Sequence, residues 1–144
     1  MQDVNPFEKT YRKSEDWLTE LCDDLNWNDR HKAYRALRAT LHALRDRLPM
    51  EESVQLGAQL PMLIRGLYYE GWRPSETPDK ELDRAAILAR VRDAFEYDSA
   101  FNSKSVVLAV FRLLESHISE GESQDIASVL PEKLRMLWRE AVAV

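Results

Sequence analysis

The sequence contains few of the cysteine and glycine residues on which disulfide-rich and turn-rich folds depend. Its 144 residues include one cysteine, four glycines and six prolines, and its net charge is −5. A single cysteine excludes an internal disulfide framework and favours a reducing, cytoplasmic setting. The first residues lack a basic segment followed by an apolar one, so we expect no export. The apolar runs are too short for a membrane span, and the acidic balance argues against nucleic acid as a partner.

What the sequence does contain is helical periodicity. No Asn-Gly or Asp-Gly pair and no useful alternating pattern occurs, which leaves little room for a sheet. We therefore predict an all-α protein. The clearest helix is expected between Asn28, as its cap, and Pro49, which ends it. Its apolar stripe consists of Tyr34, Leu37, Leu41, Leu44 and Leu48.

A shift of 70 residues aligns the second half of the chain with the first. The identical pairs between positions 51 and 70 and their counterparts are Glu52 and Glu122, Ser53 and Ser123, Leu60 and Leu130, Pro61 and Pro131, Arg65 and Arg135, Leu67 and Leu137, and Glu70 and Glu140. Background composition would give about one identity over such a stretch. We therefore predict one domain, residues 1–144, with about eight helices in two tandem four-helix repeats, 8–73 and 79–142, sharing one core. The alternative is a chance likeness between amphipathic helices.

Two local sequence patterns predict where helices begin, one at the boundary between the repeats and one within the second repeat. Thr77 is expected to cap a helix that Pro78 opens. Ser119 followed by Glu122 predicts a capping box, in which each residue would bond the other's backbone N–H group.

The repeats also supply a filter for functional residues, because a feature present in both of them is expected to serve folding. One feature of the first repeat alone is an aromatic cluster, Tyr68, Tyr69, Trp72 and Arg73, with Gly71 as the left-handed end of the helix. Aromatic residues and arginine dominate protein interfaces, so this cluster is the predicted surface for a protein partner or for self-association. The alternative is that Trp72 folds back and seals the gap between the repeats.

A second feature of the first repeat alone is a basic stripe on the helix that carries the leucines. Arg35, Arg38, His42 and Arg45 share one face with His31. This face is the basis of an alternative function, binding of a small molecule or an anion. The competing interpretation is that this face is exposed to solvent and that its positive charges balance the acidic residues of the first helix.

Signatures of catalysis are absent from the sequence. It contains no Gly-rich phosphate loop, no nucleophile elbow and no standard metal-ligand spacing. Cys22 has no basic neighbour and is expected to be an inert thiol. We predict no catalytic residue, no metal and no cofactor, and the predicted function is a non-enzymatic, helical protein-interaction domain.

One stretch carries a resemblance to a known family. The run RALRATLHALRDRLPMEESVQLGAQLPMLIRGLYYEGWRP, residues 35–74, resembles the bacterial domain-of-unknown-function 2267 family. The resemblance extends over residues 17–138 and is looser in the second half. It implies a small, all-helical bacterial protein and assigns no catalytic residues.

Overall fold

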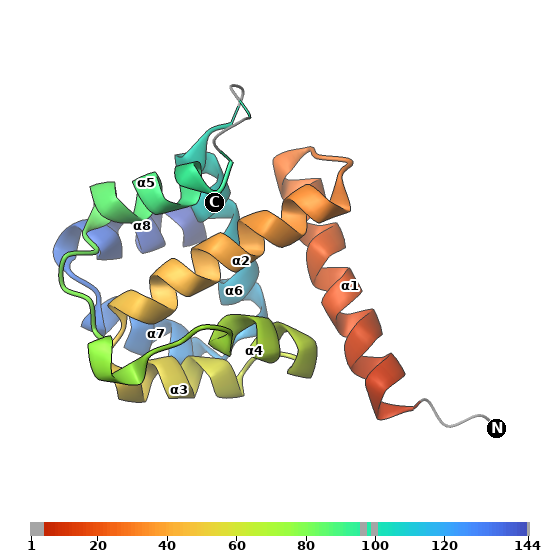
Figure 1. Cartoon of the computed structure of the whole chain (residues 1–144), viewed down its shortest axis with the longest axis horizontal. Coiled ribbons are helices and arrows are strands. Elements are labelled where there is room, and N and C mark those ends of the chain that lie inside the picture. The colour runs from red at the N-terminus through yellow and green to blue at the C-terminus, as the bar shows by residue number, and fades with distance from the viewer. Residues whose placement is uncertain (1–4, 96–97, 99–100, 144) are drawn as a thin grey trace.

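The computed structural model describes residues 5–95, 98 and 101–143, and within them the chain is helical without a strand (Figure 1). The predicted all-α class is confirmed. The first half contains α1 (Pro6–Leu25), α2 (Arg30–Arg47), α3 (Met50–Ala58) and α4 (Met62–Tyr69). A 3-10 turn, η1 (Pro74–Glu76), precedes α5 (Arg84–Asp93), α6 (Ser103–His117), α7 (Glu120–Val129) and α8 (Glu132–Val142). No helix in the described part of the chain is long and apolar enough to cross a membrane.

The start of α2 differs by one residue from the prediction. Asp29, and not Asn28, is the cap, and its side chain accepts a hydrogen bond from the backbone N–H of Lys32 at 3.1 Å. Only the residue directly before the first helical residue can reach the free N–H groups of that turn. The end of α2 at Arg47 lies before Pro49, as predicted.

The connection between the halves also departs from the prediction. The helix expected at Pro78 begins only at Arg84, where the Asp83 side chain accepts from the N–H of Ala86 at 2.9 Å. The intervening segment is fastened to α2, because the N–H of Asp79 donates to the carbonyl of Asp46 at 2.7 Å. The left-handed end of α4 at Gly71 is confirmed, with φ at +75°.

The core lies around α2 and α6, which contact each other and most of the remaining helices. Leu37, Leu41, Leu44 and Leu48 of the predicted stripe are fully buried, whereas Tyr34 at its beginning is 39% exposed. All eight α-helices contribute to one cluster of buried apolar side chains. Buried leucines of both halves thus belong to the same cluster.

The two halves pack in corresponding ways. When α1–α4 are exchanged with α5–α8, the set of extensively contacting helix pairs is unchanged: α1 meets α6 as α5 meets α2, and α3 meets its own counterpart α7. The side chains of Arg65 and Arg135 also correspond, because each donates to carbonyls in its preceding turn, at positions 57, 58 and 60 or 127, 128 and 130. These correspondences support the two repeats, 8–73 and 79–142, which stay a prediction.

Candidate functional site

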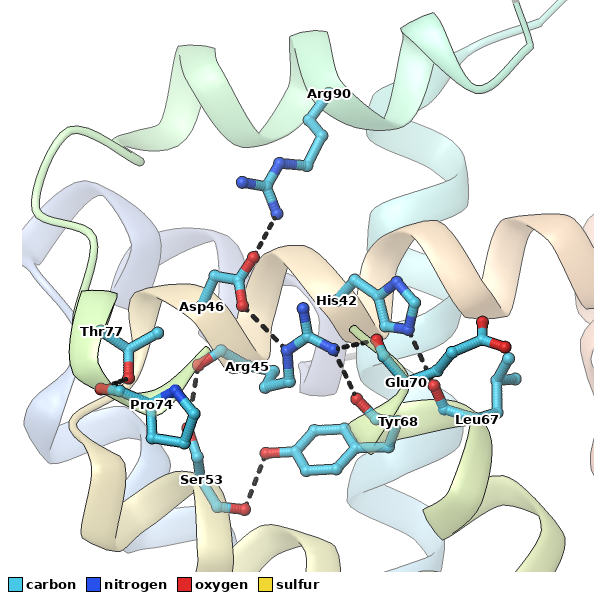
Figure 2. A network of polar contacts seen from close by, with 10 residues as sticks. All are labelled: His42, Arg45, Asp46, Ser53, Leu67, Tyr68, Glu70, Pro74, Thr77 and Arg90. Carbon is cyan, nitrogen blue, oxygen red and sulfur yellow. Dashed lines mark hydrogen bonds and ion pairs between the residues drawn. The ribbon is translucent and has the colours of Figure 1, made fainter. Parts of the chain in front are cut away.

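The first residue of the predicted aromatic cluster lies inside the core. Tyr68 is 0% exposed, and its hydroxyl donates to the carbonyl of Ser53 at 2.8 Å (Figure 2). Burial raises the pKa of Tyr68, which keeps the phenol neutral. Tyr68 therefore holds α4 against α3 and has no surface with which to touch a partner.

The remaining residues of the cluster are more exposed than Tyr68, and Tyr69 contacts α3. The rings of Tyr69 and Trp72 are 5.3 Å apart between centroids, and the Tyr69 hydroxyl fills the space where a side chain at Gly57 would lie. Trp72 is half-buried. Arg73 is exposed and pairs with Glu76 at 3.5 Å. The structure thus brings Tyr69 and Trp72 together and leaves Arg73 pointing to solvent.

Within the basic stripe, Arg45 is the residue whose environment differs most from a solvated face. It is 4% exposed, and one guanidinium nitrogen donates to the carbonyls of Tyr68 and Glu70, both at 2.8 Å (Figure 2). Another nitrogen donates to Asp46 at 2.8 Å, and Arg90 of α5 binds the same carboxylate at 2.8 Å. Although burial opposes it, these two arginines hold the pKa of Asp46 below its usual range. Arg45 therefore ties the end of α4 to α2.

The other three members of the stripe also have partners within the chain. His42 contacts the carbonyl of Leu67 through Nε2 at 2.8 Å, and burial lowers the pKa of this imidazole. Arg38 pairs with Glu70 at 2.8 Å, and Arg35 donates to the carbonyl of Ala94. These contacts give the stripe a structural role, and anion binding by Arg35, Arg38, His42 and Arg45 stays a prediction.

Sequence reasoning missed an apolar groove between α1, α2 and α4. It has a volume of about 390 Å³, and Tyr11, Leu18, Tyr34 and Leu63 are among its lining residues. Tyr11 is 57% and Leu63 is 50% exposed. The hydroxyl of Ser14, which is 8% exposed, lies in the lining without a hydrogen-bond partner. The groove therefore combines solvent-facing apolar surface with one unsatisfied buried polar atom.

A signal for this groove was present in α1. Trp17 and Leu21 form its buried stripe, whereas Phe7, Tyr11 and Leu18 follow a second stripe on a neighbouring face. Leu18 is partly buried and packs against the core, whereas Phe7 and Tyr11 of the second stripe are exposed.

The corresponding place in the second half is a hollow of about 420 Å³ between α5 and α8. Its lining includes Asp83, Arg84 and Lys133 beside Leu88 and Met136. Of these charged residues, Lys133 stands where the first half has apolar Leu63, whereas Arg84 replaces Ser14 and Asp83 replaces Lys13.

Sequence reasoning also missed a group of carboxylates that could hold a metal ion. One oxygen each from Glu52, Glu122 and Asp125 lies within 4.8 Å of the others, where α3 meets α7. Only half of the predicted capping box forms. The Ser119 hydroxyl accepts from the N–H of Glu122 at 3.1 Å, but the backbone N–H of Ser119 donates to the Gln59 side chain instead of to Glu122. The Glu122 side chain is thereby free to face Glu52.

Comparison with known proteins gives one family. The family described as an uncharacterized conserved protein (DUF2267) matches residues 14–137. No curated protein matches the chain. The matched residues run from the first turns of α1 into α8 and so include almost all of the helical arrangement. The chain belongs to the DUF2267 family.

Proposed function

We propose that this chain is a helical protein-interaction domain that binds a helix in the groove between α1, α2 and α4, and that the helix it binds is α1 of a second copy. One observation carries the proposal: three apolar residues of the groove lining are exposed in the first half, whereas the second half has charged residues at the three equivalent positions. Helix-in-groove binding uses an apolar channel of this kind between packed helices.

Three groove positions show the contrast at a spacing of 70 residues. The pairs are Tyr11 and Glu81, Tyr34 and Lys104, and Leu63 and Lys133. Lys104 and Lys133 lie on α6 and α8 as Tyr34 and Leu63 lie on α2 and α4, so the fold does not require apolar residues at these two positions. Glu81 lies before the start of α5, because α5 is shorter than α1. Exposed apolar surface that folding does not require is typical of an interaction site.

The distribution of charge on α1 supports a second copy as the occupant. Residues 6–13 carry three basic side chains and one acidic side chain, whereas residues 14–25 carry five acidic side chains and no basic one. Two α1 helices in antiparallel orientation would set the basic half of each beside the acidic half of the other. A two-fold axis perpendicular to α1 gives this orientation, with each copy presenting the same surface to its partner.

The outer end of α1 offers the apolar side chains for this contact. Phe7 is 74% exposed in the first turn of α1, which lies at the edge of the molecule (Figure 1), and Thr10 in the next turn is bonded to α4. Phe7 and Tyr11 lie one helical turn apart and continue the stripe that enters the groove at Leu18. In a dimer these side chains would leave water, which is favourable for association.

In this arrangement the Tyr69–Trp72 pair serves the packing of α4 on α3, and the sequence-based interface at Trp72 becomes the competing surface.

We further propose a cytoplasmic location in a bacterium. Cys22, the single cysteine, is free and 6% exposed, and burial raises the pKa of its thiol. An unpaired, unreactive thiol fits a reducing compartment.

The test is the mass of the protein in solution, measured by light scattering and sedimentation as the concentration rises. The wild-type chain should form a dimer between about 10 and 500 µM. A triple variant, Tyr11→Glu, Tyr34→Lys and Leu63→Lys, introduces into the groove the residues found at the equivalent positions of the second half. It should remain a monomer with unchanged helical circular dichroism. Leu63→Lys alone, at a half-exposed position, provides the same test if the triple variant does not fold.

Met136→Lys is the matched control, because Met136 is an exposed apolar residue in the hollow of the second half. This variant should still form the dimer. A wild-type monomer over the whole concentration range would overturn self-association. A dimer that survives the groove substitutions but dissociates with Trp72→Ala would transfer the interface to the sequence-predicted surface and overturn the groove.

A further inference from the structure

The seam between α3 and α7 contains two acidic side chains that are removed from solvent. Glu52 is 7% exposed and Glu122 is 5% exposed, and each is the third residue of its helix. The exposed carboxylate of Asp125 completes the group, in which all three ligand oxygens lie within 4.8 Å of one another. Each half of the chain thus contributes one buried glutamate to the same point.

These carboxylates have no counter-charge in the described part of the chain. None of the three forms an ion pair there, and the Oε2 atoms of Glu52 and Glu122 are buried without a hydrogen-bond donor. Asp46, by contrast, is half-buried and binds two arginines. Buried carboxylates in proteins are paired, protonated or bound to a cation.

The helix positions of the two glutamates favour their ionised form. Both lie in the first turn of a helix, where the aligned peptide dipoles stabilise negative charge. Against this, burial and the adjacent Glu52 carboxyl raise the pKa of Glu122 to about 8. A pKa of about 8 places a proton on Glu122 at neutral pH, and a bound cation would displace that proton.

We propose that Glu52, Glu122 and Asp125 bind a divalent cation of the oxygen-preferring class, Mg²⁺, Mn²⁺ or Ca²⁺. All three donors are carboxylate oxygens, which are the ligands that these ions select. Opposite ligands of one ion lie two metal–oxygen distances apart, about 4.2 Å for Mg²⁺ and about 4.8 Å for Ca²⁺. The spacing of at most 4.8 Å in the structure fits the coordination sphere of Ca²⁺, and the smaller Mg²⁺ would draw the carboxylates together. Solvent can complete the sphere beside the exposed Asp125.

A cation at this position would join α3 to α7 and so link the two halves away from the groove. The site is therefore independent of the proposed self-association. A cation-binding protein that stays monomeric and a dimer that binds no cation are both possible results, and each would decide one proposal without affecting the other.

The experiment titrates chelator-treated protein separately with Mg²⁺, Mn²⁺ and Ca²⁺, by calorimetry and by thermal unfolding. We expect saturable binding of one ion per chain and a rise in Tm with cation concentration, because an ion that binds only the folded state stabilises it. Glu122→Gln and Asp125→Asn should each weaken binding about tenfold or more. Without cation, Glu122→Gln should unfold at an equal or higher temperature, since the amide is of similar size and carries no charge that burial opposes.

Glu51→Gln is the matched control, because Glu51 is an exposed carboxylate in the same helical turn as Glu52. It removes one negative charge and should leave the titration unchanged. Absence of saturable binding for all three ions up to about 10 mM would overturn the proposal, and would leave a shared proton as the neutralising group. Binding that Glu122→Gln and Asp125→Asn do not weaken would overturn it as well.

Discussion

At position 63 of the first half a leucine stands half exposed beside the groove, and 70 residues later Lys133 occupies the corresponding position on α8. The same exchange of an apolar for a charged residue occurs at Tyr11 and Tyr34. Arg65 and Arg135, by contrast, make the same set of hydrogen bonds in both halves. Comparing the halves therefore separates residues that the helix arrangement needs from residues that only one half has.

The largest expected effect comes from a buried residue that only the first half has. Arg45→Ala should lower the free energy of unfolding by about 3 kcal/mol, because it removes the donor to two backbone carbonyls and one partner of Asp46. Glu115, the residue 70 positions later, is partly exposed, and Glu115→Ala should change the stability by less than about 0.5 kcal/mol. Urea denaturation of both variants checks the contrast, and equal losses would show that the two halves do not differ here.

The next effect should be equal in the two halves. Arg65→Ala and Arg135→Ala each remove hydrogen bonds to the carbonyls of the preceding turn, and each should cost about 1–2 kcal/mol in the free energy of unfolding. Denaturation midpoints, with Arg73→Ala as the control at an exposed arginine, provide the measurement. Strongly unequal losses would count against the correspondence of the repeats.

The smallest effect concerns pH and His42. Because burial lowers the pKa of this histidine in the folded state, the unfolded chain takes up a proton first as the pH falls. Stability from His42 is therefore present above about pH 6.5 and is lost on acidification below it. The wild-type chain should lose more stability than His42→Gln between about pH 7 and 5, by less than about 1 kcal/mol.

His31→Gln is the control for this comparison, because His31 is exposed on the same helix. This variant should retain the acid-dependent loss of the wild type. A loss that His42→Gln keeps in full would mean that His42 is not the group responsible.

Periodicity was sufficient to predict the helices and the leucine core, because an amphipathic stripe depends only on local spacing. Leu37, Leu41 and Leu44 are buried as the spacing indicated. The start of α5 was wrong, since the Thr77–Pro78 pattern is a common start for a helix but the backbone at Asp79 bonds to α2 instead. Contacts between distant segments are not encoded in local spacing.

The same limit explains the candidate sites. Arg45 was placed on a solvated stripe, because nothing in its own helix shows that the end of α4 and the following turn cover it. The sequence comparison paired Glu52 with Glu122, but only the packing of α3 on α7 shows that the two carboxyls meet. The sequence grouped Tyr68, Tyr69, Trp72 and Arg73 in one cluster, whereas packing buries Tyr68, leaves Tyr69 and Trp72 half-buried and exposes Arg73. An interface at this cluster stays a prediction.

The most direct test of the account is amide hydrogen exchange of the wild-type protein at low and high concentration. If the groove of the first half binds α1 of a second copy, exchange should slow with concentration in residues 7–18 and 62–67, and the equivalent parts of α5 and α8 should not change. Exchange that is independent of concentration in α1, or that slows equally in α5 and α8, would contradict the claim that only the first half provides an interaction surface.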